Sequence, residues 1–466
     1  MGQVNKISEE TFDEYIKKFD RCVQKYIPPQ KNWTPPDKAV YGPNDHYKVP
    51  VKEAKELQFK AIKYQFKNHY ENNHVYNGFC KEKKVTVDDI KTYEDIEKIP
   101  LLPSDFFKGY PHGKDFATWL GNMFSIDLPE IKISGKNPNF DDVINAFNGA
   151  GMKVSYSSGT SGRHTFIPRD RKTFNIAEYL LAKAAVSMLY PLWDYNMYGY
   201  LLMPNPFKTN VFAGRGLEIY FDAVHEVKVA IDREINTEVI RQGMVNAQKG
   251  GLKAKLVASV ISRTYKKMVK DIIQWFEYHE KHKDHKIGLI GAPWILYMVM
   301  QKLEETGKTF DFAGRGGVGT GGGWKIHEHK RLPVADFRKK VEEIFGIKPE
   351  HCLDLYGMVE SNGWMVHCPE GHYLHVPHAH FHPMVLDEEF KPKGYGEYGR
   401  FAFLDGSTFS YPGFMISGDR VRLLEHCPIC DRPGPVLEPE VTRASGQEMR
   451  GCAEEMRKMM SVDIGK

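Results

Sequence analysis

The segment from Ser155 to Asp170, SYSSGTSGRHTFIPRD, contains the residue types in this chain that most clearly suggest chemistry. Six consecutive residues in it are glycine or carry a small hydroxyl group: Ser157, Ser158, Gly159, Thr160, Ser161 and Gly162. Glycine allows close approach to the backbone, so hydroxyl groups and backbone amides can surround the oxygen atoms of a phosphate. The segment lacks the GxxxxGK[ST] pattern of a Walker loop, and taken alone a flexible turn explains it equally well.

Four residues with metal-binding side chains lie further along the chain. They are Cys427 and Cys430 of a CxxC pair and, upstream of it, Cys368 and His375. Three thiolates and one imidazole can close a tetrahedral structural zinc site. His372 is an alternative fourth ligand and His367 a weaker one, so the sequence leaves the choice of histidine open. A redox-active CxxC pair would need a thioredoxin-like setting, which the surrounding sequence does not provide.

Three further segments follow the phosphate-loop candidate in the chain. They are DLYGMVE from Asp354 to Glu360, SGDRVRL from Ser417 to Leu423, and TRASGQE from Thr442 to Glu448. In this order, the four segments resemble the motifs of the adenylate-forming superfamily: the SSGTTG phosphate loop, the YGxTE motif, the GD motif and a hinge segment with an arginine before a glycine. Val359 stands where the superfamily usually has threonine. Arg163 stands where its loop usually has lysine, which keeps a cation but changes its geometry.

This resemblance implies an enzyme that uses ATP and Mg²⁺ to convert a small-molecule carboxylic acid to an acyl-adenylate. The hydroxyl-rich loop would bind the phosphates, and Glu360 would help hold Mg²⁺, because this cation prefers carboxylate oxygens. Asp419 would accept hydrogen bonds from both ribose hydroxyls. The resemblance gives the remaining roles to Tyr356 and Gly357 near adenine, Arg443 near the ribose or a phosphate, and Arg163 as the catalytic cation of the loop.

Two other segments resemble particular branches of the superfamily. IPLLPSDFFKGY, from Ile99 to Tyr110, resembles an entry motif shared by the acyl-protein synthetases of bacterial luminescence and the phenylacetate–CoA ligases. GTGGGWK, from Gly319 to Lys325, resembles the GGGWK of the luminescence enzymes, and its glycines would let the backbone approach adenine closely. These glycines are Gly321, Gly322 and Gly323, and a strand-to-helix turn explains them equally well. The phenylacetate–CoA ligases also show a similar pattern of cysteines and histidine around the zinc-site candidate.

The acyl acceptor follows from the same resemblance. Luminescence acyl-protein synthetases pass the acyl group to a cysteine near their own C-terminus, and Cys452 in MRGCAEE holds a matching position. A thiol becomes a good acyl acceptor when deprotonated, and Arg450 nearby would favour the thiolate. Eighteen residues follow Glu448, whereas most superfamily members continue into a mobile domain with a catalytic lysine. We therefore expect an acyl-protein synthetase, with an acyl reductase or another acceptor protein as its partner.

Three alternatives stay open at this point. Cys452 can be an ordinary exposed cysteine, the chain can be a CoA ligase of the phenylacetate type, or it can be a nucleotide-binding subunit without activity. The presence of Glu360, Asp419 and Arg443 argues against the last of these. The sequence does not decide whether the acid is fatty or aromatic.

Hydrophobic periodicity indicates the elements that must position these residues. Apolar residues from Phe12 to Ile27 lie on one face of a helix that Ser8 would cap, and a second helix is expected from Val51 to His74. From Lys153 on, short apolar strands alternate with helices, which predicts a parallel sheet covered by helices. The strands are expected at 197–203, 286–290, 316–320 and 352–356, the helices at 173–189, 237–247, 264–280 and 332–345, and later strands at 373–377, 384–386, 399–404 and 415–424.

Together these elements predict an α/β fold of the adenylate-forming type, with sheets flanked by helices, a small β-rich subdomain and no full C-terminal domain. We expect a helical N-terminal segment over 1–130, an α/β adenylation core over 131–370, a β-rich subdomain with the zinc site over 371–448 and a short tail over 449–466. Residues 201–212 and 291–296 are expected to wall the acid pocket.

The composition argues against several other functions. The net charge is +4 over 466 residues, so neither nucleic acid nor an anionic membrane is expected as a partner. The sequence has no run of eighteen apolar residues and no apolar segment at its N-terminus, so we expect neither a membrane span nor a secretion signal. Seven cysteines in a chain of this length are typical of reduced thiols or metal ligands, which suits the cytoplasm.

Overall fold

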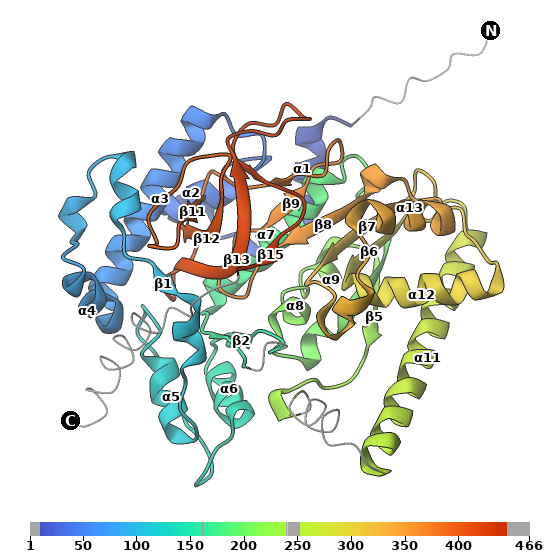
Figure 1. The fold of residues 1–466 in the computed structure, drawn as a ribbon, viewed down its shortest axis with the longest axis horizontal. Helices are drawn as coiled ribbons and strands as arrows, with labels where there is room; N and C mark the ends of the chain where they lie inside the picture. Colours follow the sequence, from blue (N-terminus) through green and yellow to red (C-terminus); the bar gives the residue numbers. More distant parts are fainter. Residues whose placement is uncertain (1–9, 160–162, 239, 241–251, 445–466) are drawn as a thin grey trace.

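The N-terminal part of the protein is a group of helices. The computed structural model describes residues 10–159, 163–238, 240 and 252–444. It begins with α1 (Phe12–Cys22), α2 (Pro35–Tyr41), α3 (Val51–Asn72) and α4 (His74–Glu82) (Figure 1). The hydroxyl of Thr11 accepts a hydrogen bond from the Glu14 amide, and the Glu14 carboxylate accepts one from the Thr11 amide. This capping box fixes the start of α1, so its cap is Thr11 and not the predicted Ser8, which lies outside the described residues.

One large sheet forms the centre of the molecule. Its strands follow the order β11-β12-β13-β14-β10-β9-β8-β7-β6-β4-β5, and the pairs from β5 to β8 are parallel. The parallel strands are β4 (Tyr198–Pro204), β5 (Glu226–Ile231), β6 (Ile287–Gly291), β7 (Gly316–Gly321) and β8 (Cys352–Tyr356). The predicted α/β class and four of these strands are confirmed. The strand predictions do not include β5, which is a partly exposed edge strand.

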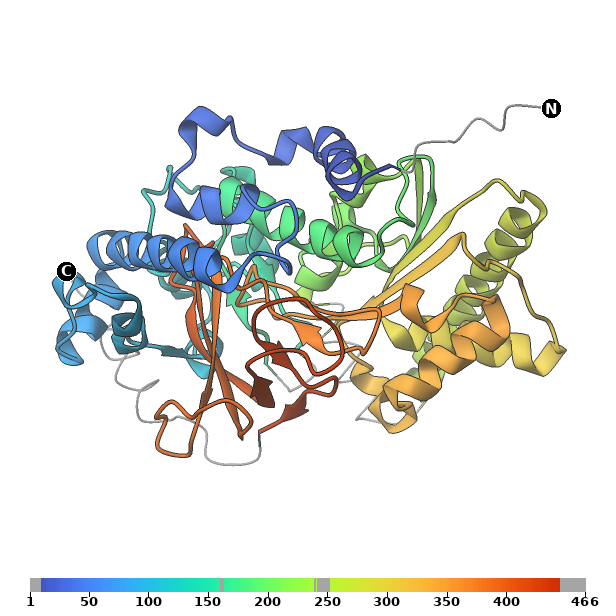
Figure 2. The same ribbon diagram turned by 90° about the horizontal axis from the view of Figure 1, so that it is seen from above.

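Helices cover both faces of this parallel region (Figures 1 and 2). One face carries α7 (Arg171–Met188), α8 (Phe212–Arg215) and α9 (Tyr220–Ala223), and the other carries α11 (Leu252–Lys281), α12 (Pro293–Thr306) and α13 (Val334–Phe345). This division follows from right-handed crossovers between parallel strands. The predictions of α7, α11 and α13 are confirmed, whereas most of the helix predicted over 237–247 lies outside the described residues. Over the part of the chain that the structure describes, no helix has the length and apolar character needed to cross a membrane.

The helix α7 is buried on all its sides. Every residue from Ile176 to Met188 is buried, because the N-terminal helices cover the side of α7 that the sheet leaves free. The ring of Phe19 in α1 lies 6.1 Å from that of Tyr179, and the Tyr15 hydroxyl donates to the Val186 carbonyl at 3.2 Å. The N-terminal helices are therefore part of the main core.

The rest of the sheet is antiparallel. It comprises β9 (Met365–His367), β10 (Leu374–His375), β11 (Phe381–Leu386), β12 (Tyr398–Asp405), β13 (Phe414–Leu424) and β14 (Val436–Leu437), with β1 (Leu102–Pro103) and β15 (Thr442–Arg443) paired to β13. The predicted later strands are confirmed. Because β9 and β10 pair across position 370 within one continuous sheet, the division of the chain at 130 and 370 stays a prediction.

A separate hairpin carries the phosphate-loop candidate. It consists of β2 (Ser155–Tyr156) and β3 (Phe166–Ile167). Phe166 packs against aromatic side chains of α5 (Lys114–Gly121) and α6 (Phe140–Gly149). This packing anchors the β3 end of the loop, and the pairing of β2 with β3 holds the other end.

Candidate active site

The phosphate-loop candidate is held closed at its base by hydrogen bonds. The Thr165 amide donates to Ser157 Oγ at 2.9 Å, and the Ser157 amide donates to the Thr165 carbonyl at 3.0 Å. Gly159 has a φ of +68°, and a Cβ atom there would lie 2.8 Å from the His164 ring, so this position requires glycine. Ser158 is half-buried, whereas Thr160, Ser161 and Gly162 lie outside the described residues.

Asp419, on β13, joins residues from three of the predicted motifs. The Tyr356 hydroxyl donates to Asp419 Oδ2 at 2.7 Å, and Arg443 Nη1 lies 2.8 Å from Asp419 Oδ1. Arg443 reaches this position because β15 places it opposite Asp419 on β13. A carboxylate offers about four acceptor positions, so each oxygen of Asp419 can still accept a further hydrogen bond. The structure thus brings together three residues that we expect to contact the nucleotide.

Glu360 lies beyond the end of β8 and is 8% exposed. Burial raises the pKa of its carboxyl group above the ordinary value, and the nearby cations Lys108 and Arg443 oppose this effect. An ionised carboxylate at such a position gains from a further cation, which fits the predicted Mg²⁺-binding role. Gly357 directly follows β8, and a Cβ atom there would lie 2.4 Å from the Trp364 ring.

Two cations lie at the phosphate-loop candidate, and one of them, Lys108, is also near Glu360. Arg163 is exposed, and its guanidinium donates to the Lys108 carbonyl at 3.4 Å. Lys108 ends the short helix η5 (Ser104–Lys108), which belongs to the segment that resembles the entry motif shared by the acyl-protein synthetases and the phenylacetate–CoA ligases. This motif includes the lysine, but the sequence does not predict its proximity to Glu360, which depends on the fold.

The three glycines after β7 are explained by the local backbone. Gly322 and Gly323 have φ angles of +77° and +69°, which favour glycine. A Cβ atom on Gly321 would lie 3.1 Å from the Leu355 carbonyl oxygen in β8, so this glycine allows the two strands to pack closely beside Tyr356. Their contact with adenine stays a prediction.

Arg169 is a residue of this region that the sequence motifs do not identify. It is fully buried, and its guanidinium donates to the carbonyl oxygens of Val359 at 2.7 Å and Ser361 at 3.1 Å, the two neighbours of Glu360. It also donates to Asn362 Oδ1 at 3.1 Å. These hydrogen bonds hold the segment that carries the predicted Mg²⁺-binding carboxylate.

The other contacts of Arg169 reach the phosphate hairpin. Its guanidinium donates to Ser155 Oγ at 3.3 Å and to the Tyr411 hydroxyl at 3.1 Å. The Tyr411 hydroxyl in turn donates to the Glu360 carbonyl at 3.1 Å. Arg169 therefore connects the start of the hairpin to Glu360. Because arginine is rarely buried and these partners are distant in the sequence, the residues around Arg169 give no sign of this role.

The zinc-site candidate combines residues from two separate segments of the antiparallel region, one around β9 and β10 and the other after β13. Its four residues are Cys368, His375, Cys427 and Cys430, whose possible ligand atoms all lie within 4.8 Å of one another. His375 Nε2 lies 3.3 Å from Cys430 Sγ. His372 instead contacts the Pro349 carbonyl, and His367 accepts a hydrogen bond from Arg338. The structure therefore gathers the set that contains His375.

The charges at this cluster suit a metal ion. Burial raises the pKa of Cys368 to about 12 and lowers that of His375 to about 3. The imidazole is thus neutral, as a metal ligand must be, and a metal ion would favour the thiolate form that burial alone opposes. These residues fit Zn²⁺, which takes thiolate and imidazole ligands in tetrahedral sites.

His375→Ala is expected to remove the bound zinc and to lower the thermal unfolding midpoint, because a closed structural site contributes directly to folding. His372→Ala, which removes the neighbouring histidine outside the cluster, should retain about one zinc per chain. Elemental analysis of both variants and of the wild type, purified without chelators, tests this. A freshly purified wild type without zinc would remove the site from consideration.

The fold and this arrangement of residues define a class of protein, the adenylate-forming ligases. The open conformation of 2-hydroxyisobutyryl-CoA ligase with 2-HIB-AMP and CoA matches 90% of this chain and 82% of that chain, with a TM-score of 0.57 and 14% identity. The same enzyme in its postadenylation state with 2-HIB-AMP also gives a TM-score of 0.57, over 90% of this chain and 74% of that chain, at 14% identity. At this identity the likeness shows the fold.

Within this class, the chain is similar to the acyl-protein synthetases. The family model described as "Acyl-protein synthetase, LuxE" matches residues 238–461. The long-chain-fatty-acid–luciferin-component ligase of Vibrio harveyi is 26% identical over 407 residues, which cover 86% of this chain and 88% of that protein. The protein of the same name from Aliivibrio fischeri is 24% identical over 415 residues, 88% and 91% of the two chains. The resemblance predicted from the motifs is confirmed, and the chain is an enzyme of the ligase class.

Proposed function

We propose that this protein is an AMP-forming acid–thiol ligase that activates a long-chain fatty acid and transfers it to its own Cys452. The observation that carries the adenylation step is the contact of Asp419 with Tyr356 and Arg443, beside the buried Glu360. The choice of a fatty acid is supported by the names of the two relatives. The acyl-protein synthetase family model extends through the position of Cys452, which itself lies outside the described residues.

The proposed reaction has two balanced steps. First, a carboxylate oxygen of the acid attacks the α-phosphorus of ATP, the bond from this phosphorus to the bridging oxygen of the β-phosphate breaks, and pyrophosphate leaves. Second, the Cys452 thiolate attacks the acyl carbon, the bond from this carbon to the AMP oxygen breaks, and AMP leaves. The thioester would then supply an acyl reductase or another acceptor protein.

Each residue contributes to a part of this sequence. Asp419 fixes the ribose, while Ser157 to Gly162 and Arg163 bind the phosphates that leave as pyrophosphate. Glu360 would hold Mg²⁺, which would offset the charge of the phosphates. Arg443 and Tyr356 keep the Asp419 carboxylate in place. Tethering a thiol to the enzyme raises its effective concentration near the adenylate.

Incubation with ATP, Mg²⁺ and a radiolabelled long-chain acid is expected to label the wild-type protein, and hydroxylamine should release the label as it does from a thioester. Cys452→Ser should lose this label almost completely while still releasing pyrophosphate, at least for one turnover. Cys22→Ser is the matched control, because Cys22 is a half-buried cysteine of α1, and it should label normally.

A different result would favour a CoA ligase. If the wild type takes up no covalent label but makes acyl-CoA when CoA is added, the acceptor is CoA and Cys452 has no part in transfer. Mass spectrometry of the protein and of the small molecules separates these outcomes.

A further inference from the structure

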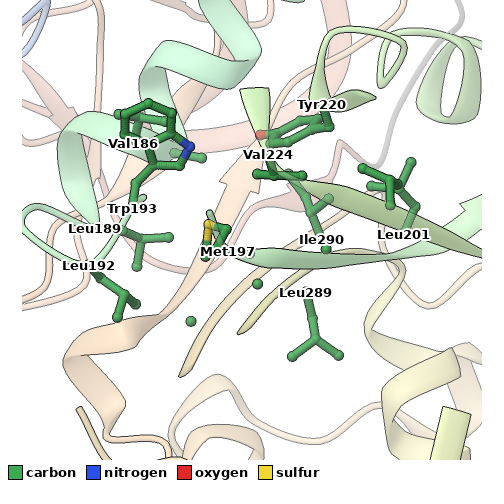
Figure 3. A pocket seen from close by; sticks show the side chains of 16 residues that line it. Val186, Leu189, Leu192, Trp193, Met197, Leu201, Tyr220, Val224, Leu289 and Ile290 are labelled. Carbon is green, nitrogen blue, oxygen red and sulfur yellow. The ribbon is translucent and has the colours of Figure 1, made fainter. Parts of the chain in front are cut away.

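An apolar cavity lies between α7 and the parallel part of the sheet (Figure 3). Its volume is about 60 Å³. Val186 and Leu189 close it from the side of α7, and Leu192, Trp193 and Met197 close it at the end where the strands begin. A cavity with such a lining stays dry and accepts apolar ligands.

Glycines form the floor of this cavity. Gly199, Gly288 and Gly317 lie side by side on β4, β6 and β7, since Gly288 pairs with both others. Gly319 lies two residues further along β7, on the same face, and also lines the cavity. Glycine in a strand interior weakens the strand, so four such positions at one cavity call for an explanation.

The space around these glycines, and not their backbone conformation, explains why they lack a side chain. None of these four glycines has a positive φ angle. A Cβ atom at Gly317 would lie 2.7 Å from Leu192 Cδ2, and one at Gly288 would lie 2.9 Å from Met197 Cε. Both contacted side chains line the cavity. A methyl group on either glycine would therefore displace a side chain that lines the cavity and change the shape of its end.

The same face of the sheet leads from the cavity to the candidate active site. Gly317, Gly319 and Gly321 alternate along β7 and face the same side. The four steps along the strand from Gly317 to Gly321 span about 13 Å at ~3.3 Å per residue. Gly321 pairs with Leu355 in β8, next to Tyr356. The cavity thus lies one strand length from the residues proposed to bind the adenylate.

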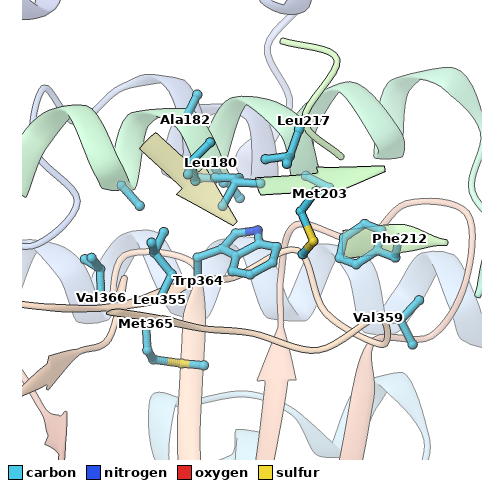
Figure 4. Close-up of a cluster of buried hydrophobic side chains, with 14 of the residues drawn as sticks. Leu180, Ala182, Met203, Phe212, Leu217, Leu355, Val359, Trp364, Met365 and Val366 are labelled. Atoms are coloured by element: carbon cyan, nitrogen blue, oxygen red, sulfur yellow. The ribbon is translucent and has the colours of Figure 1, made fainter. Parts of the chain in front are cut away.

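Apolar side chains fill the path between the two sites. Met203 follows Leu201 by two residues and shares its face, and Phe212 stacks on Trp364 with a ring-centroid distance of 6.0 Å. Figure 4 shows these side chains together with Leu355 in one cluster. Methionine is flexible and adapts to irregular spaces, so Met203 is a side chain that can move to let an acyl chain pass.

We infer that the methyl end of a straight acyl chain binds in this cavity, and that Gly288 and Gly317 set the chain length the enzyme accepts. The inference rests on the proposed function, since the carboxyl end of the same chain is the group that is adenylated. Burial of each further methylene along the path between the two sites adds a roughly constant increment to binding, until the chain meets Leu192 and Met197.

The test measures acid-dependent pyrophosphate release over a series of saturated straight-chain acids of increasing length. Gly317→Ala and Gly288→Ala are expected to shift the preferred acid to a shorter chain. For the longest acids, kcat/KM should fall about fourfold for each methylene excluded, as about 0.8 kcal/mol per buried methylene implies. For short acids the variants should match the wild type, which also shows that they are folded.

Leu192→Ala provides the opposite change, because it enlarges the end of the cavity, and it should shift the preference to longer acids. The double variant Gly317→Ala/Leu192→Ala should return toward the wild-type length. Val299→Ala is the matched control: it truncates a buried side chain of α12, on the other face of the sheet, and should keep the wild-type preference.

Two negative results have different meanings. If wild-type protein releases no pyrophosphate with any acid, the proposed function is wrong. If the wild type is active but the glycine and Leu192 variants keep its chain-length profile, the function stands and the assignment of the cavity is wrong.

Discussion

Asp419→Ala is expected to lower acid-dependent pyrophosphate release by at least about 100-fold. A carboxylate that binds two ribose hydroxyls contributes two charge-assisted hydrogen bonds, each worth about 1.5 to 3 kcal/mol. A loss of about 3 kcal/mol corresponds to a rate reduced roughly 150-fold. Stability should change little, because the partner Arg443 is 81% exposed and an ion pair of this kind contributes at most about 1 kcal/mol.

The matched control is Glu438→Ala. Glu438 pairs with Arg422, an arginine of β13, at 2.9 Å, but it lies outside the candidate site. This variant should keep normal activity. Steady-state pyrophosphate assays and thermal unfolding of both variants test the assignment, and near-normal activity of Asp419→Ala would overturn it.

Arg169→Lys is expected to raise the Mg²⁺ concentration needed for half-maximal activity and to lower kcat by about 100-fold. Lysine keeps the charge but cannot reproduce the planar fork that contacts Val359 and Ser361 together. Each buried acceptor left without its donor costs about 1 to 3 kcal/mol, and the backbone on both sides of Glu360 would move. Arg169 is thus a positioning residue, which acts through Glu360.

Arg338→Lys separates this role from a general loss of stability. Arg338 lies in the helix α13, away from Glu360. It is also buried, and it donates to the Cys352 carbonyl at 2.8 Å. Arg338→Lys should lower the unfolding midpoint to a similar degree as Arg169→Lys, without changing the Mg²⁺ requirement. Tyr411→Phe removes a single hydroxyl from the Arg169 network and should show a smaller effect of the same kind. An unchanged Mg²⁺ requirement in Arg169→Lys would make the network purely structural.

Much of the fold could be predicted because its signals are local. The strands from β6 to β8 are short runs with few polar residues, and most of the helices beside them show the helical repeat of apolar residues. Both patterns can be recognised in the sequence. β5 was missed, although Val227 and Val229 in EVKVAI alternate with charged residues, as is typical of a half-exposed edge strand. The helix α12 has apolar residues over much of its surface and so lacks a clear face.

The site was predictable where a motif names a residue, and not where the fold brings distant residues together. Asp419 and Glu360 stand in motifs, so their positions could be expected. The choice of His375 over His372 depends on the pairing of β9 with β10, which places Leu374 opposite His367. The row of glycines is invisible in the sequence for the same reason, because only the strand register shows that Gly199, Gly288 and Gly317 are neighbours.

The complete burial of α7 has a consequence for the synthesis of the chain. The side chains of α1 that cover α7, such as Tyr15 and Phe19, are made about 160 residues earlier. At about 5 to 20 residues per second, a ribosome needs roughly 10 to 30 seconds for this interval. During that time the apolar side of α1 has no native partner and is exposed to aggregation. The apolar side of α1 therefore cannot reach its final packing until α7 has been made.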